Sequence, residues 1–260
     1  MIDLKGFHAV VTGGSNGLGF EMSRALLSCG AKVAIAARKG DRLSKAFESL
    51  KGEGFDVHAL EMDVRSEGSV DAAARWVAEN WEGLDMVVNN AGLSMSRVRS
   101  NHVADPIPFF DIEPDAFYDM IETNLIGYFL VARAFVPIMV KHGGGRLVNV
   151  STGAATMVAQ GMLPYGPSRA GSDAMSTIMA KEMEAYNVTV NLLAPGGPAD
   201  TGFVTDEIRE RYNTMGLLPA SIMNDAILFL ASDKAKGITG EKIIARLFDE
   251  WLEEKGIQWR

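Results

Sequence analysis

The chain of 260 residues has a single cysteine, Cys29, and this scarcity excludes an intramolecular disulfide framework. Cys29 lies in a stretch with a helical pattern, so we expect a small packing residue rather than a reactive thiol. A run of about 18 consecutive apolar residues is also missing, and we therefore predict no membrane-spanning helix. The first residues, 1–6, lack the apolar stretch of a secretory signal, so the expected location is cytoplasmic.

Basic residues are fewer than acidic ones. The chain carries 25 Lys and Arg against 33 Asp and Glu, which gives a formal net charge of −8. Nucleic acids and anionic membranes are bound by positive surfaces, so this balance argues against both as partners. The composition, 47% hydrophobic and 22% charged, is that of an ordinary globular protein. We expect a small-molecule substrate as the partner.

Short apolar segments rich in β-branched residues alternate with longer amphipathic ones. The predicted strands are 7–12, 32–37, 55–62, 84–89, 146–150 and 188–193. The predicted helices are a segment ending at 27, then 42–50, 70–81, 115–141 and 168–186. Pro137 is expected to bend or end the last turns of 115–141. Apolar strands joined by helices predict an α/β fold with a doubly wound parallel sheet, in three αβα layers, and we predict one domain over 1–260.

Two further segments have predicted places in this fold. The long irregular stretch 93–114 follows a predicted strand, at the sheet edge where ligands bind in this architecture, so we expect it to border the ligand site. Residues 244–255 are predicted to form a C-terminal amphipathic helix that either reaches a neighbouring subunit or packs back on its own chain. The apolar residues expected on its one face are Leu247, Phe248, Trp251 and Leu252.

A glycine cluster, Thr12-Gly-Gly-Ser-Asn-Gly-Leu-Gly19, lies between the first predicted strand and the first predicted helix. Glycine lets the backbone approach a pyrophosphate closely, and a helix N-terminus adds unpaired N–H groups and the positive end of the helix dipole. A tight turn uses the same residues, but the strand–turn–helix context favours a bound dinucleotide. The predicted cofactor-binding residues here are Gly13, Ser15, Asn16, Gly17, Leu18 and Gly19.

The spacing of this cluster resembles the Thr-Gly-x-x-x-Gly-x-Gly pattern of the short-chain dehydrogenase/reductase family, and further matches follow in order between about Gly6 and Gly240. The resemblance implies a Rossmann-like fold and an NAD(P) cofactor, and we predict no metal ligands. It implies that Asp63, with Val64 beside it, holds the adenine ring. The other matched cofactor residues are Asn90, Ala91 and Gly92 of an Asn-Asn-Ala-Gly box, and Pro195 and Gly196 of a Pro-Gly segment.

Arg38 and Lys39 directly follow the second predicted strand, at the place where a carboxylate would bond the ribose 2′-OH of NAD and repel a 2′-phosphate. Two cations and no carboxylate favour the phosphate of NADP, which Arg38 can hold with two hydrogen bonds. The alternative is a pair of solvated charges at a helix start. We predict NADP, with NAD as the alternative.

Tyr165 and Arg169 lie one helical turn apart and share a face if the helix begins near Pro164. The family has Tyr-x-x-x-Lys here, with a serine thirteen positions before the tyrosine, where this chain has Thr152. The resemblance implies that Tyr165 is the acid/base in hydride transfer between an alcohol and a ketone or aldehyde. It also implies that Thr152 bonds the substrate oxygen, that Asn124 holds a water on the proton path, and that Tyr165 and Arg169 contact the cofactor.

Arg169 is the main departure from the family pattern. Arginine supplies a positive charge like lysine, but it is bulkier, planar and essentially never deprotonated. We therefore expect a working, slower oxidoreductase, or alternatively a cofactor-binding sensor or scaffold with impaired catalysis. Reduction of an activated C=C bond is a third possibility, and the tyrosine spacing fits carbonyl chemistry better.

Substrate contacts are expected from the loops at the same edge. Ser94, Met157 and Met162 are predicted to line a largely apolar pocket. Arg97 is predicted to receive an anionic group, with Arg99 and His102 beside it on the same loop. The alternative is that these three are solvated loop charges.

The segment 198–215 resembles the family's mobile lid over cofactor and substrate. Within it, Thr201 is placed to meet the carboxamide or the phosphate side of the cofactor. The family resemblance also implies assembly through the long helices, so we expect a homodimer or homotetramer.

Overall fold

The computed structural model describes residues 2–102, 104–212 and 216–259. Within them, seven parallel strands form one sheet in the order β3-β2-β1-β4-β5-β6-β7. This confirms the predicted fold class, and β7 is a strand that the sequence pattern did not predict. The strands are β1 His8–Thr12, β2 Lys32–Ala37, β3 Val57–Glu61, β4 Met86–Asn89, β5 Gly145–Val150, β6 Val188–Ala194 and β7 Lys242–Ile244.

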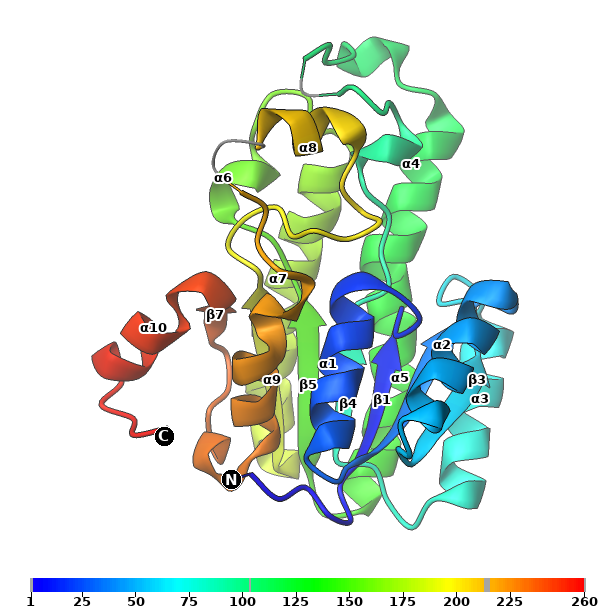
Figure 1. Cartoon of the computed structure of the whole chain (residues 1–260), viewed down its shortest axis with the longest axis vertical. Coiled ribbons are helices and arrows are strands. Elements are labelled where there is room, and N and C mark those ends of the chain that lie inside the picture. Colours follow the sequence, from blue (N-terminus) through cyan, green and yellow to red (C-terminus); the bar gives the residue numbers. More distant parts are fainter. Residues whose placement is uncertain (1, 103, 213–215, 260) are drawn as a thin grey trace.

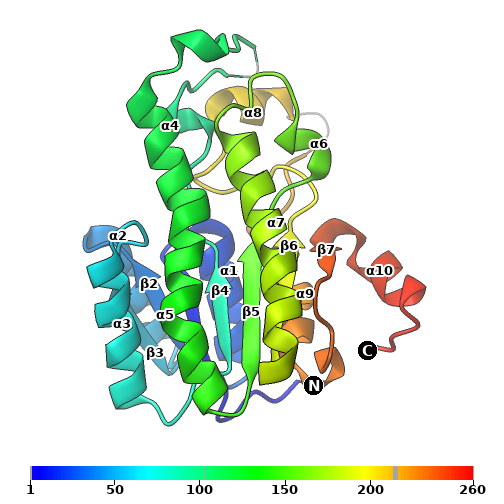
Figure 2. The same ribbon diagram turned by 180° about the vertical axis from the view of Figure 1, so that it is seen from behind.

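Helices cover both faces of the sheet, as Figures 1 and 2 show from opposite sides. Successive strand residues point to opposite faces, so Ala9 and Val11 of β1 join one hydrophobic core while Val10 joins the other. Both faces are therefore apolar, which explains the continuous apolar runs of the strands. The helices of one face are α1 Gly17–Ser28, α2 Asp41–Gly52 and α9 Asn224–Ala231; those of the other are α3 Glu67–Asn80, α5 Gly127–Lys141 and α7 Tyr165–Met183.

The strand order reverses beside β1. The chain runs outward from β1 to β2 and β3, and then crosses to β4 on the other side of β1. In open α/β sheets, ligands bind outside the carboxyl ends of the strands at such a reversal. Those ends are Thr12 in β1 and Asn89 in β4. The glycine cluster and the Asn-Asn-Ala-Gly box therefore meet at the expected ligand edge.

One helical segment runs without a break from Pro114 to Lys141. It consists of α4 Pro114–Ile121, a π-helical turn at Glu122–Ile126, and α5. Pro137 does not end this helix, which continues to Lys141. By length and composition alone the segment could cross a membrane, but a core helix passes the same test, and Val131 and Phe135 of α5 are buried in the core. Its apolar character is explained by packing on the sheet.

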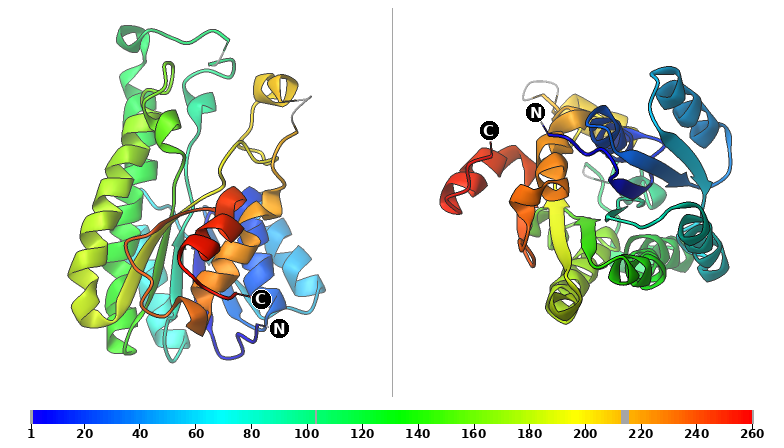
Figure 3. Two further views of the ribbon diagram at one scale, coloured as in Figure 1. Left: turned by 90° about the vertical axis from the view of Figure 1, so that its left-hand side faces the viewer. Right: turned by 90° about the horizontal axis from the view of Figure 1, so that it is seen from below.

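The predicted C-terminal helix 244–255 needs correction. Ile244 ends β7, which pairs with β6, and α10 spans only Phe248–Glu254. Leu247 is 45% exposed because it belongs to a 3-10 turn before α10, whereas Phe248, Trp251 and Leu252 are buried. The rings of Phe248 and Trp251 each lie 5.6 Å from that of Phe229 in α9. Helix α10 thus packs back on its own chain, beside α9 (Figure 3).

Several short segments rise together above the carboxyl ends of the strands (Figures 1 and 3). The loop after β4 contains two 3-10 turns, Met95–Arg97 and Phe109–Asp111. Helix α6, Ala154–Met157, follows β5, and α8, Asp206–Arg211, lies in the predicted lid. Residues 213–215, at the end of that lid prediction, lie outside the described residues. These segments surround the candidate site.

Candidate active site

The glycine positions between β1 and α1 leave little room for a Cβ atom. Gly13 and Gly17 have φ angles of 64° and 55°, which favour glycine. A Cβ on Gly19 would lie 2.4 Å from Asn90 Nδ2 and 2.5 Å from the Gly13 carbonyl oxygen. The Asn16 side chain caps α1 by accepting a hydrogen bond from the Gly17 N–H. The remaining predicted residues of this turn, Ser15 and Leu18, are half-buried.

Thr12 ties the ends of β1 and β4 together, a role that the sequence analysis missed. Its Oγ1 accepts hydrogen bonds from the N–H of Asn90 at 2.9 Å and of Ala91 at 3.0 Å. Asn90 Nδ2 donates in return to the carbonyl oxygens of Thr12 at 2.9 Å and Gly13 at 3.3 Å. Thr12 could have been predicted from its position at the end of an apolar strand, because a buried hydroxyl needs hydrogen-bond partners. These bonds fix two predicted cofactor segments against each other.

A cavity of about 350 Å³ lies between the glycine turn and the lid segment. Thr201 lines it and packs on Gly17, where a Cβ would lie 3.0 Å from Thr201 Cβ. Arg209 of α8 forms an ion pair with Asp200 and donates to the Thr201 carbonyl oxygen at 3.0 Å. Thr201 therefore lies beside the glycine turn, and whether it meets the carboxamide or the phosphate side of the cofactor stays a prediction. The glycine turn and the N-terminus of α1 fit the pyrophosphate of a dinucleotide.

The end of β2 carries the two predicted cations, Arg38 and Lys39, and both are exposed. Lys39 Nζ lies 3.6 Å from Glu61 Oε1. Among the described residues no salt bridge involves Arg38, although its charge helps to lower the pKa of Asp63. Arg38 thus keeps its hydrogen-bonding capacity for a ligand.

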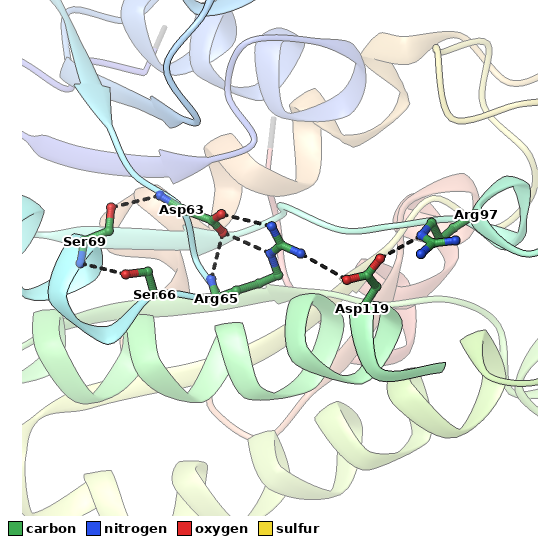
Figure 4. Close-up of polar contacts among 6 residues, drawn as sticks. All are labelled: Asp63, Arg65, Ser66, Ser69, Arg97 and Asp119. Atoms are coloured by element: carbon green, nitrogen blue, oxygen red, sulfur yellow. Dashed lines mark hydrogen bonds and ion pairs between the residues drawn. The ribbon is translucent and has the colours of Figure 1, made fainter. Parts of the chain in front are cut away.

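Asp63, the expected adenine contact, is engaged by Arg65 (Figure 4). Its carboxylate accepts hydrogen bonds from Arg65 Nε at 3.3 Å, Nη2 at 3.2 Å and the backbone N–H at 3.0 Å. Burial alone would raise the pKa of Asp63, but these bonds and the charges of Arg65 and Arg38 hold it below its usual value. Val64 beside it is buried against Gly127, where a Cβ would lie 2.9 Å from Val64 Cγ2.

A row of ion pairs continues from Asp63 to the substrate loop (Figure 4). Arg65 Nη1 lies 3.1 Å from Asp119 of α4, and the other oxygen of Asp119 lies 2.7 Å from Arg97 Nε. Arg97, predicted to receive an anionic substrate group, therefore already has a carboxylate partner. A ligand could bond only those N–H groups of the Arg97 guanidinium that Asp119 does not use.

Tyr165 and Arg169 come together as the spacing predicts. Helix α7 begins at Tyr165, directly after Pro164, and the guanidinium carbon of Arg169 lies 5.5 Å from the Tyr165 ring centroid. The Tyr165 ring also contacts Phe203 of the lid segment, with 6.3 Å between ring centroids. The phenol thus lies between a buried cation and the lid.

Arg169 is 3% exposed, and a second tyrosine holds it. Its Nη1 donates to Tyr128 Oη at 2.8 Å and to the Val150 carbonyl oxygen at 3.0 Å. Burial would lower the pKa of Arg169, but its interactions with the Tyr128 and Tyr165 phenols raise it above the ordinary value. The guanidinium is therefore a permanent positive charge. Tyr128 was not among the predicted site residues. It lies four residues after Asn124, so the sequence could have placed it on the same helix face.

Asn124 is wholly buried in the π-helical turn. Its side chain accepts a hydrogen bond from the Leu93 N–H at 2.8 Å and donates to the Leu93 carbonyl oxygen at 3.0 Å. Its Nδ2 also lies 3.2 Å from Ser168 Oγ, which donates to the Tyr165 carbonyl oxygen at 2.7 Å. Asn124 therefore links the loop after β4 to the first turn of α7.

Two residues with hydroxyl groups, Ser151 and Thr152, directly follow β5, and their hydroxyls differ in hydrogen bonding. Ser151 Oγ donates to Asp173, whose other carboxylate oxygen lies 2.6 Å from Lys242 Nζ. Thr152 is half-buried, and in the described part of the chain its hydroxyl has no hydrogen-bond partner. The hydroxyl at the family's serine position is thus the one left for a ligand.

The other predicted residues lie around this edge. Gly92 lies against Arg169, since a Cβ there would be 2.5 Å from Nη2. Gly196 has a φ of 91°, and the Pro195 carbonyl oxygen accepts from the Arg246 N–H at 3.2 Å. On the substrate side, Ser94 Oγ is 2.7 Å from Ser96 Oγ. Met157 and Met162 are half-buried before α7.

His102, in the loop after β4, contradicts one of the two expectations for this residue. It is 4% exposed, so it is not a solvated loop charge, and its Nδ1 has no hydrogen-bond partner among the described residues. Burial lowers the pKa of His102, although Glu207 acts in the opposite direction. A contact between His102 and an anionic substrate group stays a prediction. Arg99, its neighbour, is paired with Asp105.

Comparisons with known proteins agree with this arrangement. A family model described as short chain dehydrogenase matches residues 7–212. The 3-oxoacyl-(acyl-carrier-protein) reductase FabG of Aquifex aeolicus (strain VF5) is 30% identical over 250 residues, covering 93% of this chain and 96% of its own. A short-chain type dehydrogenase/reductase from Mycobacterium marinum has a TM-score of 0.80 and 26% identity, covering 93% of this chain and 94% of its own.

A solved relative holds a nucleotide cofactor. The short chain dehydrogenase from Burkholderia cenocepacia J2315, in complex with NADP, has a TM-score of 0.80 and 26% identity, and covers 93% of this chain and 96% of its own. The family match spans the glycine turn, the Asn-Asn-Ala-Gly box and the Tyr165–Arg169 pair. The chain therefore belongs to the short-chain dehydrogenase/reductase family, whose members are oxidoreductases that bind NAD(P).

Proposed function

We propose that this chain interconverts an alcohol and a ketone or aldehyde, using an NAD(P) cofactor. The observation that carries the proposal is the Tyr165 ring with the Arg169 guanidinium carbon 5.5 Å from its centroid, at the same sheet edge as the glycine turn. When bound, the nicotinamide supplies or accepts the hydride. The chain then has to move one proton at the substrate oxygen.

Tyr165 is the proposed proton donor during reduction and the acceptor during oxidation. When its hydroxyl gives a proton to the substrate oxygen, a negative charge forms on the phenol. The buried positive charge of Arg169 stabilises that anion more strongly than it would in water, because little solvent screens it. Thr152 is proposed to donate a hydrogen bond to the substrate oxygen. A water held by Asn124 stays a prediction.

We propose NADP as the preferred cofactor. Arg38 has no salt bridge among the described residues, and guanidinium binds phosphate with paired hydrogen bonds. The Burkholderia relative is in complex with NADP, which agrees with this choice.

A second candidate function is cofactor sensing or scaffolding with impaired catalysis. The observation that favours it is the fixed position of Arg169, whose Nη1 is used by Tyr128 and Val150. An arginine held in this way never releases a proton, so it cannot take part in a proton relay as an ammonium group can.

Consumption of NADPH and NADH, followed by absorbance, separates the two functions. The panel of substrates contains simple ketones, aldehydes, β-ketoacyl thioesters, quinones and keto sugar acids. Turnover of a carbonyl compound supports the oxidoreductase. Cofactor binding by fluorescence without turnover of any compound supports the sensor.

Assembly through the long helices is also proposed. Large apolar side chains on these helices are exposed in the single chain, among them Tyr118 at 61%, Phe129 at 46% and Ile178 at 57%. A homodimer or homotetramer would cover them, and the mass in solution by light scattering tests it. A cytoplasmic location, and the absence of nucleic-acid and membrane partners, stay predictions.

A further inference from the structure

We propose that Tyr128 is a positioning residue that sets where the Arg169 guanidinium lies. This inference rests on the proposed function, because it concerns the same proton donor. Tyr128 lies in α5 and Arg169 in α7, two helices that lie side by side on one face of the sheet (Figure 2). The contact therefore joins two elements far apart in the sequence.

The Tyr128 hydroxyl is itself held in place. Its Oη donates to the Val150 carbonyl oxygen at 3.2 Å and accepts from Arg169 Nη1 at 2.8 Å. Tyr128 is 1% exposed, and burial raises the pKa of Tyr128, with Arg169 acting in the opposite direction. The residue is therefore a neutral phenol in a fixed orientation, able to define the position of its partner.

The two tyrosines enclose the guanidinium. Its central carbon lies 5.4 Å from the Tyr128 ring centroid and 5.5 Å from the Tyr165 ring centroid. Nη1 is taken by Tyr128 and Val150, and Nη2 lies against Gly92. Among the described residues the buried Nε has no hydrogen-bond acceptor. The Tyr165 phenol is the second group, after Tyr128, that raises the pKa of Arg169. Tyr128 thus fixes Nη1, which leaves Nη2 against Gly92 of the predicted cofactor segment.

This arrangement explains why an arginine is accommodated here. Lysine carries its three N–H donors on one terminal nitrogen, so a bond to Tyr128 and a bond to a ligand would both have to start from that single point. Arginine has five N–H donors in a planar fork, so Nη1 can be used for positioning while the others stay available. We infer that Tyr128 and Arg169 act as one unit in place of the family's lysine.

A double-mutant cycle of Tyr128→Phe and Arg169→Lys tests this inference. Removing the Tyr128 hydroxyl from the parent is expected to lower kcat about tenfold, the order of effect for losing one hydrogen bond to a charged group, with the substrate KM unchanged. The same removal in the Arg169→Lys background is expected to have no effect. Tyr186→Phe, at an exposed tyrosine, is the matched control.

Equal losses in both backgrounds, or no loss in either, would overturn the positioning role, since a merely structural tyrosine acts independently of residue 169. Thermal unfolding of each variant checks that all four proteins are folded. Dissociation constants for NADPH, measured by fluorescence, give a second cycle that needs no turnover. If the parent turns over no carbonyl compound, the proposed function fails. The NADPH dissociation constants then still test this inference, because the effects of Tyr128→Phe and Arg169→Lys on them are non-additive if the two residues act together and additive if they do not.

Discussion

Arg38 is the residue on which the choice between the two nicotinamide cofactors depends. Its guanidinium is exposed at the end of β2, and no salt bridge involves it in the described part of the chain. The nearby Asp63 carboxylate is already engaged by Arg65. A 2′-phosphate would therefore meet an unpaired cation here.

Arg38→Asp is expected to weaken NADPH binding about 10- to 100-fold, because a charge-assisted hydrogen bond is replaced by charge repulsion. NADH binding is expected to stay the same or to become tighter. Lys51→Asp, which makes the same charge change at the far end of α2, is the matched control and should alter neither constant. Fluorescence titration measures both constants, and equal losses for NADPH and NADH would contradict the assignment.

The residues of the proton-transfer site were predictable from spacing only in part. Tyr165 and Arg169 share a helix, so one turn of α7 brings them together whatever the rest of the fold does. Tyr128 reaches Arg169 from another helix, and no local pattern records that contact. The burial of His102 in a polar loop was equally invisible, because it depends on which segments pack over it.

At the scale of elements, the β1–α1 turn depends on the absence of one side chain. A Cβ on Gly19 would meet Asn90 Nδ2 and the Gly13 carbonyl oxygen at 2.5 Å or less, and backbone cannot move aside cheaply. At Gly52, the last residue of α2, nothing lies within 4 Å of a Cβ. Both glycines lie in helices, so alanine raises the helix propensity at both positions. A difference in stability between the two alanine variants therefore reports the crowding at Gly19.

Gly19→Ala is expected to lower the free energy of unfolding by roughly 1–3 kcal/mol, the usual cost of overpacking, and to weaken cofactor binding. Gly52→Ala is expected to be neutral or to stabilise by up to about 1 kcal/mol, through a less flexible unfolded chain. Urea unfolding measures both. A Gly19→Ala protein as stable as the parent would show that the turn has room for a methyl group.

The strands and most helices were predictable because apolar periodicity is a local property. The strand 32–37 has the observed bounds, and the turn context of the glycine cluster is confirmed. Strand β7 was missed because three residues carry too little pattern, and its pairing with β6 is a long-range contact. The same pairing explains why α10 begins at Phe248 rather than at 244.

At the scale of the whole molecule, two half-buried histidines, His8 and His58, make stability depend on pH. His8 stacks on Trp81 with 5.1 Å between ring centroids, and His58 lies 5.4 Å from Trp76. Burial lowers the pKa of both histidines, while Asp85 beside His8 and Asp56 beside His58 act in the opposite direction. Their stabilising contribution is therefore complete above the unfolded-state pKa of about 6.5 and is lost as the pH falls below it.

We expect a lower urea midpoint at pH 5.5 than at pH 7.5, with unfolding followed by tryptophan fluorescence. Asp63 also makes the folded state less stable as the pH falls, but at more acidic pH. The pKa of Asp63 is lowered in the folded state, so the stability that its carboxylate contributes is lost when it is protonated. His58→Gln, which cannot be protonated, should show a smaller difference between the two pH values. Identical midpoints in the parent at both values would contradict this account.

We propose that the fold holds one phenol beside a buried cation and a bound dinucleotide. Tyr165→Phe removes only the phenolic hydroxyl and leaves the ring against Arg169 and Phe203. The most direct test is therefore the rate of carbonyl reduction by Tyr165→Phe, measured with its NADPH dissociation constant. We predict a fall in kcat of about 10²- to 10⁴-fold with unchanged NADPH binding, as expected for loss of a general acid. Turnover equal to that of the parent would contradict the proposed mechanism.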